Sequence, residues 1–231
     1  MNKSFRLKKF AIIVAGGTGK RFNADLPKQF FDVCGKPLII YTIEAFIRAV
    51  PDIEFVVVIN PKMREKWDKI LADFPVSNCI LADAGPERFH SVKNGLAKIS
   101  EENSIVAIHD AVRPFVSEEV IMLGFNDADY FGNAIPVMNI TDSVRIKDGP
   151  LNEPIDRRLL YKVQTPQCFR TGLIKKAYLQ NFDEKFTDDA IVLESIGERI
   201  HLIDGNVENI KITYPFDFLV AESILKNRRV Q

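Results

Sequence analysis

Short apolar runs alternate with amphipathic segments over the first half of the chain. The apolar runs have the length of buried strands and occupy residues 10–15, 54–60, 79–85 and 104–110. Segments with a helical spacing of apolar positions lie between them, at residues 35–50, 64–74 and 91–100. Strands that alternate with helices pack as a parallel sheet covered on both faces. The pattern therefore predicts an α/β fold with a Rossmann-like, mostly parallel twisted sheet flanked by helices.

The alternation weakens between Gly132 and Gln164, where short β-like runs mix with turn residues such as Gly149 and Pro150. We interpret the stretch of about residues 137–163 as a protruding β-arm. Beyond it the pattern predicts helices at 171–182, 187–197 and 215–228, and strands at 199–205 and 209–213. No internal repeat or linker interrupts the chain, which favours a single domain over residues 1–231.

The composition narrows the possible partners and compartments. The 31 basic and 31 acidic residues cancel, so the broad positive field of a general nucleic-acid binder is missing. Cys34, Cys79 and Cys168 lie far apart with no CxxC pair, which argues against structural zinc and against disulfides. The basic N-terminus precedes only about five apolar residues, too few for a signal peptide or a membrane span. We expect a cytoplasmic protein with neither nucleic acid nor membrane as a partner.

A glycine-rich loop follows the first predicted strand. It contains Gly16, Gly17 and Gly19, and the cations Lys20, Arg21 and Lys28 follow. Glycines allow backbone N–H groups to approach an anion, and neighbouring cations neutralise its charge. The loop predicts a polyphosphate site, and the alternative is an ordinary turn with solvated cations.

Two familiar phosphate loops do not fit this stretch. The Walker A pattern requires glycine at Val14 and Ser or Thr at Arg21, so the usual magnesium-binding hydroxyl is missing. The dinucleotide-binding pattern requires a third glycine at Phe22. Both mismatches argue against an ATPase or a dehydrogenase.

Several stretches, all in the same order, resemble one known family. They lie at residues 15–22, 26–30, 84–92, 108–116, 156–169, 187–190 and 209–217. Together they are similar to the 2-C-methyl-D-erythritol 4-phosphate cytidylyltransferases, which have a nucleotidyltransferase-type fold and act in isoprenoid biosynthesis. The resemblance implies transfer of CMP from CTP to a sugar-alcohol phosphate, with Mg²⁺ or another divalent cation. Ribitol-5-phosphate cytidylyltransferases share most of these motifs.

The resemblance also implies a set of site residues. Arg21, Lys28 and Lys211 would hold the triphosphate and the transition state. Nucleotide contacts would come from Ala15, Gly16, Gly17, Thr18, Gly19, Lys20, Gly85, Arg88, Ser91, Asp110 and Ala111. The sugar-alcohol phosphate would meet Asp110, Arg113, Ser143, Arg157 and Thr213. Asp110 could bind the ribose or a magnesium ion carried by the triphosphate, and the sequence leaves both roles open.

Some of these residues have ordinary alternative interpretations. Ser91 could cap a helix, and Arg88 could be a solvated charge. Lys211 alternates with Ile210 and Ile212, so its side chain should point away from those apolar neighbours. His109 ends a buried strand; we interpret it as structural, because an anionic phosphate nucleophile needs no strong base.

In the family, a similar arm crosses to a second subunit, where an arginine reaches the sugar phosphate. Here that residue is Arg157, with Arg158 as a less certain candidate, and the resemblance implies a homodimer. The chain departs from the family at Gly16, where alanine is usual; we expect this change mainly to increase the freedom of the loop. An apparent insertion of about two residues leaves Thr141 and Ser143 as competing contacts to the polyol.

Two other functions stay open at this point. Ribitol phosphate could be the acceptor, although Ser91 favours methylerythritol phosphate because ribitol relatives more often have Thr there. A non-catalytic nucleotide-binding regulator is the alternative of another class. Arg21, Lys28, Arg157 and Lys211 together disfavour a regulator, because binding of CTP alone would not require a cation on the arm.

Overall fold

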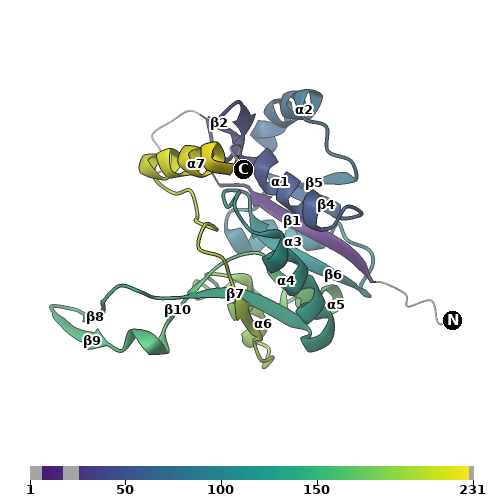
Figure 1. The fold of residues 1–231 in the computed structure, drawn as a ribbon. Helices are drawn as coiled ribbons and strands as arrows, with labels where there is room; N and C mark the ends of the chain where they lie inside the picture. The colour runs from purple at the N-terminus through teal and green to yellow at the C-terminus, as the bar shows by residue number, and fades with distance from the viewer. Residues whose placement is uncertain (1–6, 18–25, 229–231) are drawn as a thin grey trace.

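The computed structural model describes residues 7–17 and 26–228, which are built around one twisted sheet (Figure 1). The strand order in the described residues is β10, β7, β11, β6, β1, β4, β5, with β12 beside β7. Their bounds are β1 Lys8–Ala15, β4 Glu54–Ile59, β5 Cys79–Asp83, β6 Ser104–Asp110, β7 Asn133–Asn139, β10 Tyr161–Val163, β11 Gln167–Arg170 and β12 Leu202–Asp204. β6, β1, β4 and β5 pair in parallel, whereas β11 is antiparallel to β6 and β7. The predicted mostly parallel α/β fold is confirmed.

Helices cover both faces of the sheet, and alternate residues of β1 show why. Ala11 and Ile13 pack into the core formed with α1, α2 and α4, whereas Phe10 and Ile12 pack into the core formed with α3, α5 and α6. A strand buried on both faces is apolar at nearly every position, which is the pattern of its sequence. The helix bounds are α1 Leu38–Ala49, α2 Arg64–Asp73, α3 Arg88–Leu96, α4 Glu118–Phe131, α5 Thr171–Ala177, α6 Asp189–Glu194 and α7 Pro215–Arg228.

Helix α4 and strand β7 were not predicted. Ser117 caps α4, since its hydroxyl accepts a hydrogen bond from Val120 N at 3.2 Å. Gly132 ends the helix with a φ of +89°, a conformation that glycine adopts without strain. β7 follows directly and is buried over its first five residues. Residues 133–136, where the sequence pattern weakens, are therefore part of the sheet.

The arm is shorter than the predicted stretch of residues 137–163. Val137 pairs with Val163 and Asn139 with Tyr161, so both ends of that stretch belong to the sheet. The projecting part, residues 140–160, contains a hairpin of β8 Val144–Asp148 and β9 Leu151–Ile155 and extends away from the body of the molecule (Figure 1). The sequence boundary failed because strand and hairpin have similar short β-like patterns.

The predicted strand at residues 209–213 is absent, because this segment forms no ladder of hydrogen bonds with another strand. Ile212 N donates to Val112 O at 2.9 Å, whereas the Asn209 carbonyl accepts from the Arg113 side chain. Ile212 is fully buried in a small core with Phe115 and with Ala221 of α7. The predicted alternation still holds, because Lys211 is exposed next to buried Ile212.

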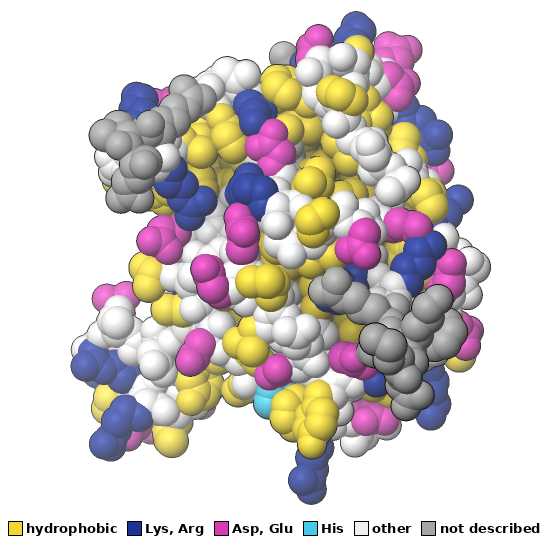
Figure 2. Space-filling model, turned by 45° about the vertical axis from the view of Figure 1, so that its right-hand side comes forward, with side chains coloured by type: hydrophobic (Ala, Val, Ile, Leu, Met, Phe, Trp, Pro, Cys, Tyr) yellow, Lys and Arg dark blue, Asp and Glu magenta, His cyan; other side chains and the backbone are white. Residues whose placement is uncertain are grey.

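Two surface properties concern possible partners. Within the described residues, no helix is long and apolar enough to cross a membrane. On the face shown in Figure 2, basic and acidic side chains are interspersed with hydrophobic ones. Among its described residues this face has no broad positive patch, so an anionic ligand would depend on cations that line a cavity.

Candidate functional site

Two cavities adjoin at the carboxyl ends of the parallel strands, where ligands of open α/β sheets bind. We call the first the glycine-loop cavity; its volume is about 680 Å³ and its walls include Ala15, Gly16, Lys28, Gly85 and Ser91. We call the second the sheet-edge cavity; its volume is about 630 Å³ and its walls include Arg113, Thr165, Gln167, Asp188 and Tyr161. Each is in the size range of a small-molecule site.

The start of the glycine loop is held by a side chain that the sequence analysis did not select. Gln29 is buried, and its Nε2 donates to Ala15 O at 2.6 Å and to Gly17 O at 3.0 Å. These two hydrogen bonds satisfy the carbonyl groups of Ala15 and Gly17. Gln29 lies in a short 3₁₀ helix, Lys28–Phe30. The first residue of this helix, Lys28, lines the cavity wall.

Close backbone packing shapes the opposite wall of the glycine-loop cavity. A Cβ atom at Gly85 would lie 2.3 Å from His90 Cβ, and one at Gly16 would lie 2.4 Å from Ala84 Cβ. Gly16 therefore serves a close approach between two loops. An alanine there would collide with Ala84 unless the loops moved. The expected gain in freedom of the loop stays a prediction.

Ser91 joins this wall from within α3. Its hydroxyl accepts from Gly85 N at 3.0 Å and donates to Glu87 O at 3.2 Å. Ser91 is the fourth residue of the helix, and the N-cap is Glu87, so the alternative of a capping serine is wrong. The serine fixes the Gly85 turn against the start of α3.

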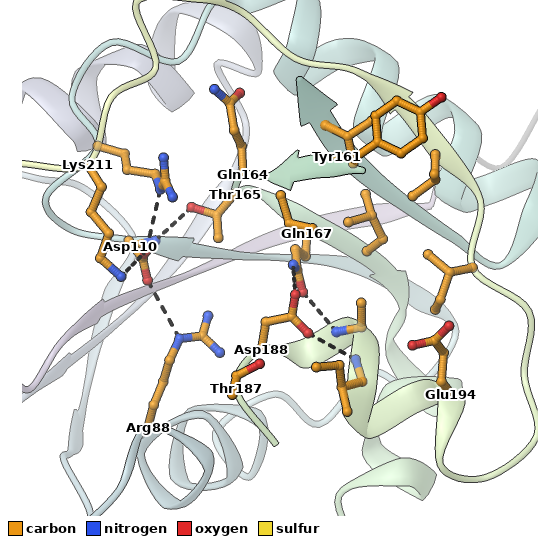
Figure 3. Close-up of a pocket in the computed structure, with 18 residues that line it drawn as sticks. Arg88, Asp110, Tyr161, Gln164, Thr165, Gln167, Thr187, Asp188, Glu194 and Lys211 are labelled. Atoms are coloured by element: carbon orange, nitrogen blue, oxygen red, sulfur yellow. Dashed lines mark hydrogen bonds and ion pairs between the residues drawn. The ribbon is translucent and has the colours of Figure 1, made fainter. Parts of the chain in front are cut away.

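Three charged residues line both cavities and form their junction: Arg88, Asp110 and Lys211 (Figure 3). Asp110 ends β6, and its Oδ2 lies 2.9 Å from Lys211 Nζ. Arg113 Nε lies 3.4 Å from the same oxygen, and Arg88 Nε lies 3.6 Å from Oδ1. Burial raises the pKa of Asp110, but the three cations outweigh it and hold the pKa far below its ordinary value. The carboxylate is therefore charged at any physiological pH.

Arg88 is not a solvated charge. Its Nη1 and Nη2 donate to the two carboxylate oxygens of Asp189 at 2.8 and 2.7 Å. Asp189 is fully buried and also accepts a 2.6 Å hydrogen bond from Tyr178 OH. Burial alone would lower the pKa of Arg88, but Asp189 and Asp110 raise it above its ordinary value. Arg88 therefore stays charged.

His109 lies behind the sheet-edge cavity and is fully buried. Its Nε2 is 3.0 Å from Arg113 O, a carbonyl that can only accept, so Nε2 carries the proton. Nδ1 is then the acceptor for the Thr165 hydroxyl at 3.0 Å. Burial lowers the pKa of His109 to about 4, so the ring is neutral at pH 7. This geometry supports the interpretation of a structural histidine.

The remaining predicted residues fall into several groups. Gly17 and Thr213 line the glycine-loop cavity, whereas Ala111 is buried and lines neither cavity. Ser143 and Arg157 are exposed on the arm, outside both cavities of their own chain. The predictions for Thr18, Gly19, Lys20 and Arg21 lie outside the described residues.

The sequence analysis missed three residues that shape the site: Gln29, Thr165 and Asp189. All three lie within the stretches that carry the family resemblance, at residues 26–30, 156–169 and 187–190. Their location in these stretches was the signal in the sequence that could have identified them. Their roles depend on partners 12 to 101 positions away in the chain, which a single sequence does not indicate.

The residues at the junction can be tested for a divalent cation. In the described part of the chain, no group of three or more His, Cys, Asp or Glu side chains is placed to hold a metal. Asp110 offers one carboxylate, and both of its oxygens already face cations. This donor set fits a Mg²⁺ that is held mainly by a polyphosphate, because Mg²⁺ often takes only one or two protein carboxylates.

An open α/β sheet with two adjoining cavities and fixed cations at their junction is the arrangement of a nucleotidyl-transfer enzyme. The family model for 2-C-methyl-D-erythritol 4-phosphate cytidylyltransferase matches residues 10–227, and the chain belongs to that family.

Individual relatives agree with this assignment. The chain is 43% identical over 217 residues to the enzyme of that name from Bacteroides fragilis, covering 93% of this chain and 98% of the relative. It is 40% identical over 225 residues to the one from Geobacillus kaustophilus, covering 96% and 98%. The crystal structure of 4-diphosphocytidyl-2C-methyl-D-erythritol synthase from Anaerococcus prevotii superposes with a TM-score of 0.81 at 27% identity, covering 95% and 96%.

Proposed function

We propose that this chain transfers CMP from CTP to 2-C-methyl-D-erythritol 4-phosphate and releases pyrophosphate. The observation that carries the proposal is the pair of cavities that share Arg88, Asp110 and Lys211. Each cavity is large enough for one reactant, and the shared residues lie where the two reactants would meet. Neither reactant alone would require two cavities joined by three charged side chains.

The glycine-loop cavity is the proposed nucleotide site. Backbone groups of Ala15, Gly16 and Gly17 would face the triphosphate, and Gly85 and Ser91 would face the base and ribose. Lys28 on the same wall would neutralise phosphate charge, together with Arg21 from the loop. Close backbone packing at Gly16 and Gly85 supports this, because Ala84 and His90 occupy the space where a Cβ atom would lie and so hold both turns in place on the cavity wall.

The sheet-edge cavity is the proposed site of the sugar-alcohol phosphate. Arg113 is buried and fixed by Asp110 and by the Asn209 carbonyl, so it presents a held cation to an anionic group. Thr165 donates its hydroxyl proton to His109, and its oxygen accepts from Asp110 N at 3.2 Å. One lone pair of Thr165 remains to accept a hydrogen bond from a polyol hydroxyl.

In the proposed reaction, a phosphate oxygen of the polyol attacks the α-phosphorus of CTP. The new P–O bond forms as the bond to the β-phosphate oxygen breaks, and pyrophosphate leaves with the electron pair. The nucleophile is already an anion, so positioning and charge stabilisation supply the catalysis. Lys211 and Lys28 would stabilise the charge on the α-phosphate. Mg²⁺ would neutralise the triphosphate, with Asp110 as a carboxylate ligand from the described part of the chain.

A homodimer would complete the site. Arg157 lies on the arm, which extends away from the body of its own chain (Figure 1), and it lines neither cavity of that chain. The arm leaves Leu151 70% and Leu159 76% exposed, and a lone two-stranded hairpin is marginally stable in water. Crossing to a second subunit would cover these side chains. It would also bring Arg157, with Thr141 or Ser143, to the partner's polyol phosphate.

Pyrophosphate release tests the proposed reaction. The full-length protein is assayed with CTP, Mg²⁺ and either 2-C-methyl-D-erythritol 4-phosphate or ribitol 5-phosphate. We expect release with the first acceptor and much less with the second. Preference for ribitol 5-phosphate would assign the alternative substrate, and CTP binding without release from either acceptor would favour the non-catalytic regulator.

Mixing two inactive variants tests the crossed arm. Arg157→Ala removes the arm cation, and Lys211→Ala disables the body of the same chain. In a mixed dimer with crossed arms, one site combines an intact body with an intact arm, so the mixture should regain activity. If each arm served its own chain, every site of the mixture would stay defective.

A cytosolic location remains a prediction. Cys79 and Cys168 are free thiols, which is usual in a reducing compartment. Fractionation of the producing cells, followed by detection of the protein, would test it.

A further inference from the structure

Arg88 stands between the two cavities and is fixed at both ends of its guanidinium. Nη1 and Nη2 bind both oxygens of Asp189, and Nε faces Asp110 at 3.6 Å. A bidentate pair of this kind fixes the plane of the guanidinium as well as its position. The orientation of Arg88 therefore depends on Asp189, although Asp189 itself lines neither cavity.

Asp189 is itself held by a rigid support. It is the first residue of α6, fully buried, and receives the Tyr178 hydroxyl at 2.6 Å. Gln167 of β11 anchors the same helix start, because its Nε2 donates to Asp188 Oδ2 and its Oε1 accepts from Ala190 N, at 3.0 and 2.9 Å. The carboxylate is thus tied to the sheet through α6 and cannot follow a movement of Arg88.

The chain of contacts continues from Arg88 to the cation proposed to act on the reacting phosphate. Asp110 Oδ1 faces Arg88, and Asp110 Oδ2 lies 2.9 Å from Lys211 Nζ (Figure 3). The Lys211 side chain is 46% exposed, so this contact is its main restraint among those described. Without Asp189, Arg88 could turn its Nη groups toward Asp110 and compete with Lys211 for the carboxylate.

We propose that Asp189 is a positioning residue for the transfer reaction: it holds Arg88, Arg88 orients Asp110, and Asp110 places Lys211 Nζ at the junction of the two cavities. This inference rests on the proposed function, because it takes Lys211 to act on the reacting phosphate. It predicts that Asp189 affects turnover and not the binding of CTP. Loss of the buried negative charge would leave the junction more positive, which favours a triphosphate.

The variant Asp189→Asn tests this. We expect kcat to fall at least tenfold, whereas the Kd of CTP measured by calorimetry stays within threefold of the wild-type value or decreases. A smaller fall in kcat would overturn the inference. So would a fall in kcat accompanied by CTP binding weakened more than threefold, since general disruption around α3 would have that effect.

Asp129→Asn is the matched control, because it removes another Arg–Asp pair, between Arg170 and Asp129 at 2.6 Å, away from both cavities. It should leave kcat and the Kd of CTP unchanged. If Asp189→Asn does not fold, Asp189→Glu keeps the buried charge but displaces Arg88, and the same two criteria apply. Wild-type turnover is measured first: an inactive wild type counts against the proposed function, and an active wild type with an unaffected variant counts against the positioning role alone.

Discussion

The two cavities differ in how they are built. The glycine-loop cavity is formed largely by backbone that follows individual strands, with short-range supports such as Gln29 for the loop and Ser91 for Gly85. The sheet-edge cavity is formed by side chains from β6, β7, β11 and α6, which are far apart in the chain. The first can be inferred from local motifs, whereas the second exists only after the chain has folded.

The junction belongs to both cavities, so its loss should have the largest effect. Lys211→Ala removes a fixed cation proposed to stabilise the transition state. We expect kcat to fall by about 10²–10³-fold, or roughly 3–4 kcal/mol, with a small change in the KM of CTP. Steady-state kinetics with both substrates varied would measure this.

The control for Lys211 is Lys226→Ala, since Lys226 on α7 pairs only weakly with Glu222 at 3.4 Å on the exposed surface. Its kcat should match the wild type. A kcat for Lys211→Ala within threefold of the wild type would remove Lys211 from the reaction centre.

A change in the glycine-loop cavity should affect CTP alone. In Gly85→Ala the new Cβ would lie 2.3 Å from His90 Cβ, so the turn must move away from α3. We expect a loss of roughly 1–3 kcal/mol in folding free energy and about a tenfold weaker binding of CTP. Calorimetry and urea unfolding measure the two effects.

Gly172→Ala is the matched control, because a Cβ there would meet its nearest atom at 3.5 Å, an ordinary contact. It should bind CTP normally. Normal CTP binding by Gly85→Ala as well would mean that this turn does not shape the nucleotide site.

A change in the sheet-edge cavity should affect the polyol phosphate alone. Asn209 is fully buried, and its Nδ2 donates to Thr165 O at 2.8 Å and to Gln164 Oε1 at 3.2 Å. Asn209→Ala leaves these acceptors short of a partner, at a cost of about 1–3 kcal/mol. We expect the KM of the polyol phosphate to rise about tenfold, with the KM of CTP within twofold.

Asn94→Ala serves as its control, because Asn94 Nδ2 makes one exposed bond to Asp83 O at 2.9 Å. Both KM values should be unchanged in that variant. If Asn209→Ala raised both KM values equally, the cavities would not be separable and the comparison between them would fail.

The smallest expected effect is a pH dependence that arises under the sheet-edge cavity. Burial lowers the pKa of His109 to about 4, from about 6.5 in an unfolded chain. Between these values the unfolded chain binds a proton that the folded chain does not, so the free energy of unfolding decreases as the pH falls. The free energy of unfolding falls by about 1 kcal/mol between pH 7 and pH 5.5, and the loss reaches about 3 kcal/mol near pH 4.

Urea unfolding at a series of pH values measures this slope. In His109→Asn the slope between pH 6.5 and pH 4 should be smaller by up to one proton. An unchanged slope would mean that His109 does not titrate in this way.

The sequence predicted most of the fold, and its failures have physical reasons. The strands and helices of the first half of the chain could be predicted. A strand buried on both faces of the sheet, such as β6, is apolar at nearly every position and stands out from the amphipathic helices. Helix α4 had usable signals in Ser117 and Gly132 that were overlooked. β7 could not be separated from the arm, because its partners β10, β11 and β12 come later in the chain.

The candidate site divides in the same way. Gly16, Gly85, Ser91 and Lys28 were predicted, and the structure gathers them in one cavity. The partner of Arg88 was not predicted, because Asp189 is 101 positions away and only folding brings the pair together. The predicted strand around Lys211 was wrong. The predicted alternation of an exposed Lys211 with a buried Ile212 was correct, because one side of a segment can be buried without hydrogen bonds to a neighbouring strand.

The central claim is that the two cavities hold both reactants at once and meet at Asp110 and Lys211. Calorimetric titration of 2-C-methyl-D-erythritol 4-phosphate into protein saturated with an unhydrolysable CTP analogue and Mg²⁺ tests it most directly. The account predicts that one equivalent of the polyol phosphate binds, with an affinity at least equal to that for the protein without nucleotide. Failure of the polyol phosphate to bind the nucleotide-saturated protein would show that both compete for one site and would contradict the account.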